Sequence, residues 1–229
     1  MNIAVITARG GSKRIPRKNI KEFYGKPVIA YAIKAALESE IFNEVFVSTD
    51  DEEIAEIAQS FGATVPWLRS KELSDDYATT VVVMQDAVLR LNSSLANLEN
   101  ICCIYPVTPL LKSRFLAQGL EILQNGNWDY VISALRSETQ QERLFSLGPA
   151  NEVQMHFPKQ IETLTQNFSI TYQDAGQFYW GRKSSWELAK PIFSTTSTII
   201  EMPENFSVDV NTLDDWRRAE HLFESQKSS

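Results

Sequence analysis

The chain has 229 residues, of which 43 % are apolar and 22 % are charged, values that are ordinary for a globular protein. This length suits one domain, or one domain with a sizeable insertion. No stretch approaches the ~20 apolar residues of a membrane helix, and the run Ile3–Ile6 is too short for a signal peptide. We therefore expect a soluble, cytoplasmic protein that does not bind a membrane. The adjacent Cys102 and Cys103 fit neither a disulfide framework nor a metal site, and are expected to be buried in a strand.

The net charge is −7, but the basic residues are unevenly distributed. Between Arg9 and Lys26, seven basic residues accompany a single acid, Glu22, so this segment carries +6 and the rest of the chain −13. The overall acidity argues against general nucleic acid binding, whereas a basic island on an acidic protein favours a small anionic ligand. On charge alone, a solvated surface loop explains the pattern about as well.

Strand-like and helix-like patterns alternate along the first 135 residues. Asn2–Thr7 is a β-branched run, and after the basic segment Ile29, Ile33 and Leu37 recur at helical spacing. Further strands are expected at Val45–Ser48, at a short segment that ends near Val65, at Ile101–Tyr105 and at Tyr130–Leu135. Further helices are expected after an acidic capping box of Asp50 and Glu53, at Thr79–Leu91 and at Ser113–Leu123. The alternation predicts a three-layer, Rossmann-like α/β fold with a mainly parallel sheet, whose ligands bind at the carboxyl ends of the strands.

The helical periodicity fades between residues 136 and 172, where Gln, Glu, Thr, Pro and aromatic residues mix. We interpret 136–172 as an insertion of hairpins and loops within one domain, 1–229, and as a candidate dimerisation arm. The pattern then resumes with strands expected at Gln177–Trp180, Ser197–Met202 and Phe206–Val210, and with a final helix that begins at a capping box of Thr212 and Asp215.

The basic loop Ala8–Asn19 has the composition of a phosphate-binding site. Its glycines allow tight turns and bring N–H groups close to phosphate oxygens, and its arginines and lysines neutralise the concentrated charge of a triphosphate. It is not a Walker loop, because the only Gly-Lys pair, Gly25-Lys26, is followed by Pro27 and has no glycine five residues before it. A Gly-x-Gly-x-x-Gly motif is also absent, which disfavours a P-loop kinase or a dinucleotide-binding domain.

Asp209 and Asn211 form a second candidate site. Residues two apart in a strand project to the same face, so both side-chain oxygens could meet one hard cation that bridges phosphates. The alternative is that Asp209 serves turn or cap chemistry before the last helix, which Thr212 can provide without it. His156 and His221 are far apart and lack zinc-ligand spacing, so they are expected to be structural or exposed.

Six sequence blocks resemble, in order, the signature of the cytidylyltransferases that activate nonulosonic acids, the sialic-acid-like sugars. The blocks are Ala8–Asn19, Val47–Ala55, Leu68–Leu73, Tyr105–Pro109, Gly176–Gly181 and Ser207–Thr212. The likeness to enzymes that activate the eight-carbon acid of lipopolysaccharide is more distant. Gly176–Gly181 and Tyr105 resemble the pseudaminic acid branch more than the N-acetylneuraminate branch, where a Gln commonly stands at the position of Tyr105.

The resemblance implies a homodimeric nucleotidyltransferase that uses Mg²⁺ to transfer CMP from CTP to the anomeric hydroxyl of a nonulosonic acid, pseudaminic acid above all. Pyrophosphate is the other product, and the activated sugar serves surface glycan biosynthesis. The implied roles are triphosphate contact for Arg9 and Lys18, nucleotide binding for Ser12 and Asn19, cytosine binding for Arg69 and Thr80, sugar binding for Tyr179, and metal binding for Asp209 and Asn211. The sialic acid branch usually has two aspartates at the metal positions, so Asn211 removes one negative charge.

Three alternatives remain open. The acceptor could be N-acetylneuraminate, legionaminate or the eight-carbon acid of lipopolysaccharide. The protein could instead be a noncatalytic nucleotide-binding module that has lost metal affinity, for which Asn211 is the only support. A nucleotidyltransferase acting on a sugar 1-phosphate would have a similar basic loop but would lack the Asp209 block. The sequence identifies no general base.

Overall fold

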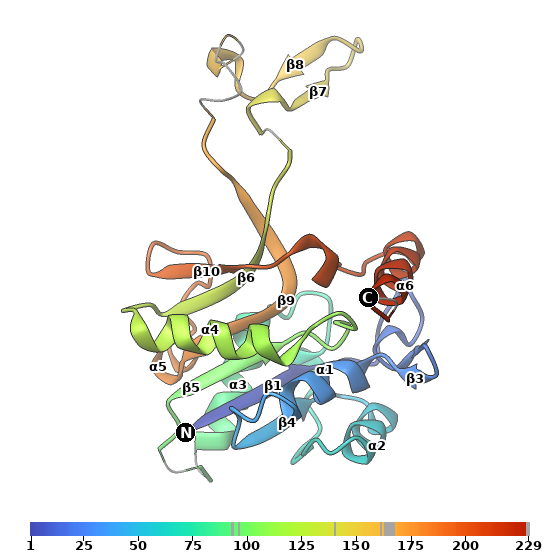
Figure 1. The fold of residues 1–229 in the computed structure, drawn as a ribbon, viewed down its shortest axis with the longest axis vertical. Coiled ribbons are helices and arrows are strands. Elements are labelled where there is room, and N and C mark those ends of the chain that lie inside the picture. The colour runs from blue at the N-terminus through green and yellow to red at the C-terminus, as the bar shows by residue number, and fades with distance from the viewer. Residues whose placement is uncertain (93, 96, 140, 161, 163–167, 228–229) are drawn as a thin grey trace.

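A six-stranded sheet with the order β10-β6-β9-β5-β1-β4 forms the centre of the protein (Figure 1). The computed structural model describes residues 1–92, 94–95, 97–139, 141–160, 162 and 168–227. The strands are β1 (Asn2–Thr7), β4 (Glu44–Ser48), β5 (Asn100–Ile104), β6 (Tyr130–Arg136), β9 (Tyr172–Arg182) and β10 (Ser197–Glu201). Only β9 runs antiparallel to its neighbours in this sheet, so the expectation of a mainly parallel sheet is confirmed.

Helices cover both faces of this sheet and complete the predicted three layers (Figure 1). The covering helices are α1 (Ile29–Leu37), α2 (Glu52–Ser60), α3 (Thr80–Asn92), α4 (Ser113–Asn125) and α5 (Lys183–Glu187), whereas α6 (Leu213–Lys227) packs beside the basic loop. Apolar residues of α1, α2 and α4 share one buried cluster with the sheet, and those of α3 and α5 share another. None of the described helices is long and apolar enough to cross a bilayer.

The central strands β1 and β5 are buried on both faces, which explains their continuous apolar sequences. Ala4 and Ile6 of β1 belong to the cluster with α1, whereas Ile3 and Val5 belong to the cluster with α3. In β5, Cys102 belongs to the cluster with α1 and Cys103 to the cluster with α3. Both are buried free thiols, as predicted. Full burial of an aliphatic side chain stabilises a fold by about 1.5–3 kcal/mol, so both layers are held firmly to the sheet.

A third apolar cluster fastens the basic loop to the C-terminal helix. Ile15 and Phe23 pack there with Trp216 and Ala219 of α6. The rings of Phe23 and Trp216 meet edge to face, with centroids 5.5 Å apart. Thr212 and Asp215 form the predicted capping box, because each side chain accepts a hydrogen bond from the backbone N–H of the other. This packing holds the segment before α6 close to the basic loop.

Three local expectations were wrong. Asp50 does not cap α2, because its Oδ1 accepts the N–H of Gly10, and Asp51 is the N-cap instead. The segment near Val65 makes only isolated bridges to the β4 region, and Pro66, which lacks an N–H, interrupts it. Residues 206–210 are not a strand, since they are tied to β9 mainly through side chains: Gln177 donates to the carbonyl oxygen of Phe206.

Between β6 and β9 the chain leaves the body and forms a projecting hairpin of β7 (Phe145–Leu147) and β8 (Val153–Met155) (Figure 1). The insertion expected at 136–172 corresponds to this region, although its residues 140, 161 and 163–167 lie outside the described part of the chain. The remaining short elements are β2 (Glu22–Phe23), β3 (Lys26–Pro27) and the 3₁₀ helices Lys18–Ile20, Lys71–Leu73, Gln141–Arg143, Pro158–Gln160 and Glu204–Phe206.

Candidate active site

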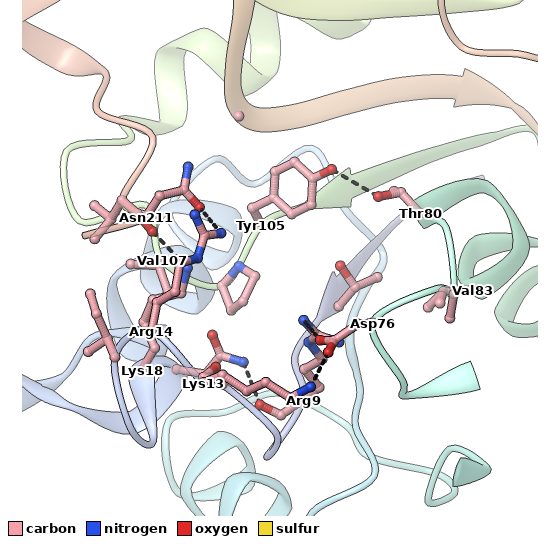
Figure 2. Close-up of a pocket in the computed structure, with 18 of the residues that line it drawn as sticks. Arg9, Lys13, Arg14, Lys18, Asp76, Thr80, Val83, Tyr105, Val107 and Asn211 are labelled. Atoms are coloured by element: carbon pink, nitrogen blue, oxygen red, sulfur yellow. Dashed lines mark hydrogen bonds and ion pairs between the residues drawn. The ribbon is translucent and has the colours of Figure 1, made fainter. Parts of the chain in front are cut away.

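A cavity of about 390 Å³ lies at the carboxyl ends of β1 and β5, where the fold predicts a ligand site (Figure 2). The basic loop that follows β1 forms one part of its wall. Further wall residues come from the segment before α3, from the turn after β5, from the beginning of β9 and from the segment before α6. Because β9 is antiparallel to β5, its first half reaches the same edge of the sheet. Segments distant in sequence thus share one cavity.

The basic loop is fastened to the beginning of α2. The N–H of Gly10 donates to Asp50 Oδ1 at 3.1 Å, and Arg17 forms ion pairs with Asp51 and Glu53. The guanidinium of Arg17 lowers the pKa of Asp51 through its hydrogen bond to that carboxylate. A Cβ atom at position 10 would lie 2.5 Å from Asp51 Oδ2, so a larger residue there would have to displace this carboxylate. Acids at the beginning of α2 and immediately before it therefore hold the loop in place.

Four basic side chains of the loop contact oxygen atoms around the cavity (Figure 2). Arg9 Nη1 donates to the carbonyl oxygen of Asp75 at 2.6 Å. Arg9 and Lys13 both pair with the carboxylate of Asp76, at 2.9 and 2.5 Å. The other two basic residues reach the segment before α6, where Arg14 Nη2 donates to Asn211 Oδ1 at 2.6 Å and Lys18 Nζ to the carbonyl oxygen of Val210 at 2.7 Å. Positive charge from one loop is therefore concentrated in one cavity.

Lys18 has the most distinctive electrostatic environment of these residues. Burial lowers the pKa of its ammonium group, and the nearby charges of Arg14 and Arg9 lower it further, whereas Asp209 opposes the shift. An ammonium group that is partly desolvated beside other cations gains strongly from an additional anion. The phosphate-binding role predicted for Lys18 requires such an ammonium group at the cavity wall.

The other nucleotide-binding candidates also line the cavity, namely Ser12, Asn19, Arg69 and Thr80. Asn19 is buried and donates to the carbonyl oxygen of Arg9 at 2.9 Å, so it shapes the loop from within. Arg69 is 6 % exposed and donates to the carbonyl oxygens of Ala8 and Ser48, at 2.8 and 3.0 Å. These bonds join the ends of β1 and β4, a structural role that the sequence did not reveal.

Asp209 and Asn211 lie side by side, although not through strand geometry. Asn211 Nδ2 donates to Asp209 Oδ2 at 2.6 Å, and Arg14 uses the amide oxygen of Asn211. Among the described residues there is no group of three His, Cys, Asp or Glu side chains suited to a metal ion. Mg²⁺ commonly binds to one or two carboxylates together with substrate phosphates and water. The exposed carboxylate of Asp209 beside four basic residues fits that mode, whereas the oxygen of Asn211 is already bonded to Arg14.

Tyr179 does not lie where the sequence placed it. It is 2 % exposed and is not part of the cavity wall; the wall residue is Tyr105, whose hydroxyl lies 3.5 Å from that of Tyr179. Tyr105 also bonds to Thr80 at 2.9 Å (Figure 2). Sequence reasoning overlooked the wall residues Asp76 and Asp174, although Asp174 precedes the Gly176–Gly181 block by only two positions.

Comparisons with known proteins show the family to which this chain belongs. Residues 3–212 match the family model described as cytidylyltransferase. The pseudaminic acid cytidylyltransferase of Campylobacter jejuni is 40 % identical over 228 residues, which are 100 % of this chain and 98 % of that protein. N-acylneuraminate cytidylyltransferase A of Danio rerio is 33 % identical over 95 % of this chain and 49 % of its own length.

Two solved structures share the fold at low sequence identity. CMP:2-keto-3-deoxy-manno-octonic acid synthetase complexed with CTP superimposes with a TM-score of 0.71 at 15 % identity, covering 98 % of this chain and 99 % of that one. The 4-diphosphocytidyl-2C-methyl-D-erythritol synthase of Anaerococcus prevotii superimposes with a TM-score of 0.64 at 14 % identity, covering 97 % of this chain and 98 % of that one. Because the family model spans nearly the whole chain and the Campylobacter relative aligns over all of it, the protein belongs to the cytidylyltransferase family.

Proposed function

We propose that this protein transfers CMP from CTP to the anomeric hydroxyl of pseudaminic acid and releases pyrophosphate, as a cytoplasmic step of surface glycan biosynthesis. The observation that carries the proposal is the convergence of Arg9, Lys13, Arg14 and Lys18 beside Asp209 in a cavity that also has a polar wall at Tyr105. The relative from Campylobacter jejuni, 40 % identical over the whole chain, supports pseudaminic acid as the acceptor. The cytoplasm is proposed because CTP is made there.

In this proposal, phosphate oxygens of CTP replace the protein oxygens that now accept hydrogen bonds from the basic side chains. Arg9 and Lys13 would exchange Asp76 for phosphate, and Lys18 would exchange the carbonyl oxygen of Val210. The anomeric hydroxyl oxygen attacks the α-phosphorus and its bond to phosphorus forms, the hydroxyl proton passes to water, and the bond between the α-phosphorus and the departing pyrophosphate breaks. Lys18 stabilises the charge that collects on the leaving phosphates.

We further propose that Asp209 holds Mg²⁺, which neutralises phosphate charge when it is bound. Asn211 is the second candidate ligand, and its oxygen becomes available when Arg14 turns to a phosphate. In either state the amide of Asn211 orients the carboxylate of Asp209. A single carboxylate from the protein predicts that the ion binds mainly as a complex with the triphosphate.

Pyrophosphate release in the presence of candidate acceptors tests the proposed reaction. The purified protein is incubated with CTP, Mg²⁺ and one acid at a time: pseudaminic acid, N-acetylneuraminate, legionaminate or the eight-carbon acid of lipopolysaccharide. We expect release with pseudaminic acid at the highest kcat/KM. Release with only another acid would show that the acceptor is wrong, and CTP binding without release in any mixture would favour a noncatalytic module.

The variant Asp209→Asn tests the metal site. Removing the charge of the carboxylate should raise the Mg²⁺ concentration for half-maximal activity by about tenfold or more, because the ion loses its anionic protein ligand. The measurement is a Mg²⁺ titration of initial rates at saturating CTP. Asn211→Ala serves as the comparison and should shift the titration less. An unchanged Mg²⁺ dependence in Asp209→Asn would contradict the assignment.

Asp76 competes with CTP for the same cations. In the variant Asp76→Asn, Arg9 and Lys13 lose their anionic partner and become available to phosphate, so the Kd for CTP should fall by about twofold to fivefold. Titration calorimetry measures this change. Asp214→Asn is a matched control, since Asp214 pairs with Arg217 on α6 and is not part of the cavity wall. Weaker CTP binding in Asp76→Asn would show instead that Asp76 supports the site.

We also propose that the protein is a homodimer joined through the hairpin of β7 and β8. Phe145 and Leu147 alternate along β7 and therefore share one face of the hairpin, and Val153 pairs with Leu147 across it. All three are more than half exposed, which leaves an apolar face on the projecting arm.

Light scattering should therefore give a mass twice that of the 26.0 kDa chain. Leu147→Glu should shift the population to monomer at micromolar concentration, because a carboxylate on this face would be buried without a partner. Ser146→Glu places the same charge on the opposite face of β7 and should leave the dimer intact. A monomeric wild type would contradict the proposal.

A further inference from the structure

Asp174 places a negative charge at the wall of the cavity without a cationic partner. It lies on β9, lines the cavity together with Tyr105 and Gly176, and is exposed. Within the described part of the chain it forms no ion pair, whereas Asp76 in the same wall binds both Arg9 and Lys13. A carboxylate in this situation is suited to accept hydrogen bonds from neutral N–H or O–H groups of a ligand.

The side chain of Asp174 is held in place by its neighbours. One oxygen, Oδ2, accepts the hydroxyl hydrogen of Tyr179, and the other, Oδ1, accepts the N–H of Gly176 at 3.0 Å. Burial raises the pKa of Tyr179, which keeps its hydroxyl protonated and able to donate. Two hydrogen bonds leave further lone pairs on the carboxylate for a ligand. Asp174 therefore presents a fixed acceptor to the cavity.

The charges of the cavity also orient an acidic sugar. A nonulosonic acid carries a carboxylate, which the anion of Asp174 repels. Its hydroxyl and acylamino groups are hydrogen-bond donors without charge, and these are complementary to Asp174. The two ends of the acceptor are thus distinguished by electrostatics alone.

We infer that Asp174 is a specificity-determining residue, whose carboxylate accepts a hydrogen bond from an amide N–H or a hydroxyl of the acceptor sugar, and that Tyr179 is its positioning residue. The inference rests on the proposed function, because it concerns the acceptor of the same reaction. It also gives the buried Tyr179 an indirect role in sugar binding. A site built to hydrogen-bond a donor discriminates strongly against an analogue that lacks it, because its polar group is then left without a partner.

A purely structural role for Asp174 makes different predictions. Gly176 has a φ of +61°, and the register of β6 and β9 shifts between Ile132 and Ala134, so Asp174 could serve only to hold this irregular turn. Asp174→Asn keeps one acceptor oxygen for the N–H of Gly176, but it removes the negative charge and replaces the other acceptor oxygen with an NH2 donor. If the role is structural, the variant should either leave the KM values for CTP and for the acid nearly unchanged or raise both KM values together.

Steady-state kinetics with CTP and pseudaminic acid varied separately test the inference. In Asp174→Asn, the KM for the acid should rise by about 10-fold to 100-fold, since a hydrogen bond to a charged acceptor is lost, while the KM for CTP stays within about twofold. Tyr179→Phe should raise the KM for the acid in the same direction but less. Asp214→Asn, outside the cavity, should change neither value.

A double variant separates positioning from packing. If Tyr179 acts through Asp174, the variant Asp174→Asn/Tyr179→Phe should have the same KM for the acid as Asp174→Asn alone. Effects that multiply would show that Tyr179 acts independently, and would overturn its positioning role. The thermal transition of each variant shows whether it is folded, and Asp174→Asn, at an exposed position, is expected to fold like the wild type.

The outcomes distinguish this inference from the proposed function. If the wild type is active with an acid but Asp174→Asn changes its KM for that acid by less than twofold, the proposed function stands and the inference fails alone. An equal rise in the KM for CTP and for the acid also overturns it. If the wild type releases pyrophosphate with none of the acids, the proposed function fails and the inference fails with it.

Discussion

The attachment of the basic loop to the beginning of α2 is the interaction on which the rest of the site depends. Five cationic residues between Arg9 and Lys18 would repel one another if they were not held by nearby acids. Asp51 accepts hydrogen bonds from Arg17 and from the helix N–H of Ile54, so one carboxylate caps α2 and anchors the loop. With Arg17 used in this way, the other four cations are directed toward the cavity.

The antiparallel direction of β9 provides the second constraint on the site. It brings Asp174 and Gly176 to the edge of the sheet at which β1 and β5 end. A Cβ atom at position 176 would lie 3.2 Å from the carboxyl group of Asp209, and its positive φ also favours glycine. The hydrogen bonds from Thr80 through Tyr105 and Tyr179 to Asp174 then connect α3 with β9. This connection links the two walls of the cavity.

Much of the architecture could be predicted because it follows from local patterns. The β-branched run Asn2–Thr7 and the apolar run Ile101–Tyr105 indicated strands, and the spacing of Ile29, Ile33 and Leu37 indicated a helix. The alternation of the two elements predicted a parallel sheet and the edge at which ligands bind. The composition of Ala8–Asn19 predicted a phosphate site. The predictions of a short strand near Val65 and of a strand at Phe206–Val210 were wrong, because a short apolar run does not reveal which partner bonds to its backbone N–H and C=O groups.

The sequence by itself thus determined the layered fold, the basic loop and the approximate position of the site, because propensity, periodicity and charge act over a few residues. Only the tertiary structure decided which side chains share the cavity. Asp76, Asp174 and Asn211 come from three distant segments, and their partners depend on how those segments pack. Burial likewise separated Tyr105, which lines the cavity, from Tyr179, which lies behind it. Such contacts depend on long-range packing, which no local pattern in one sequence contains.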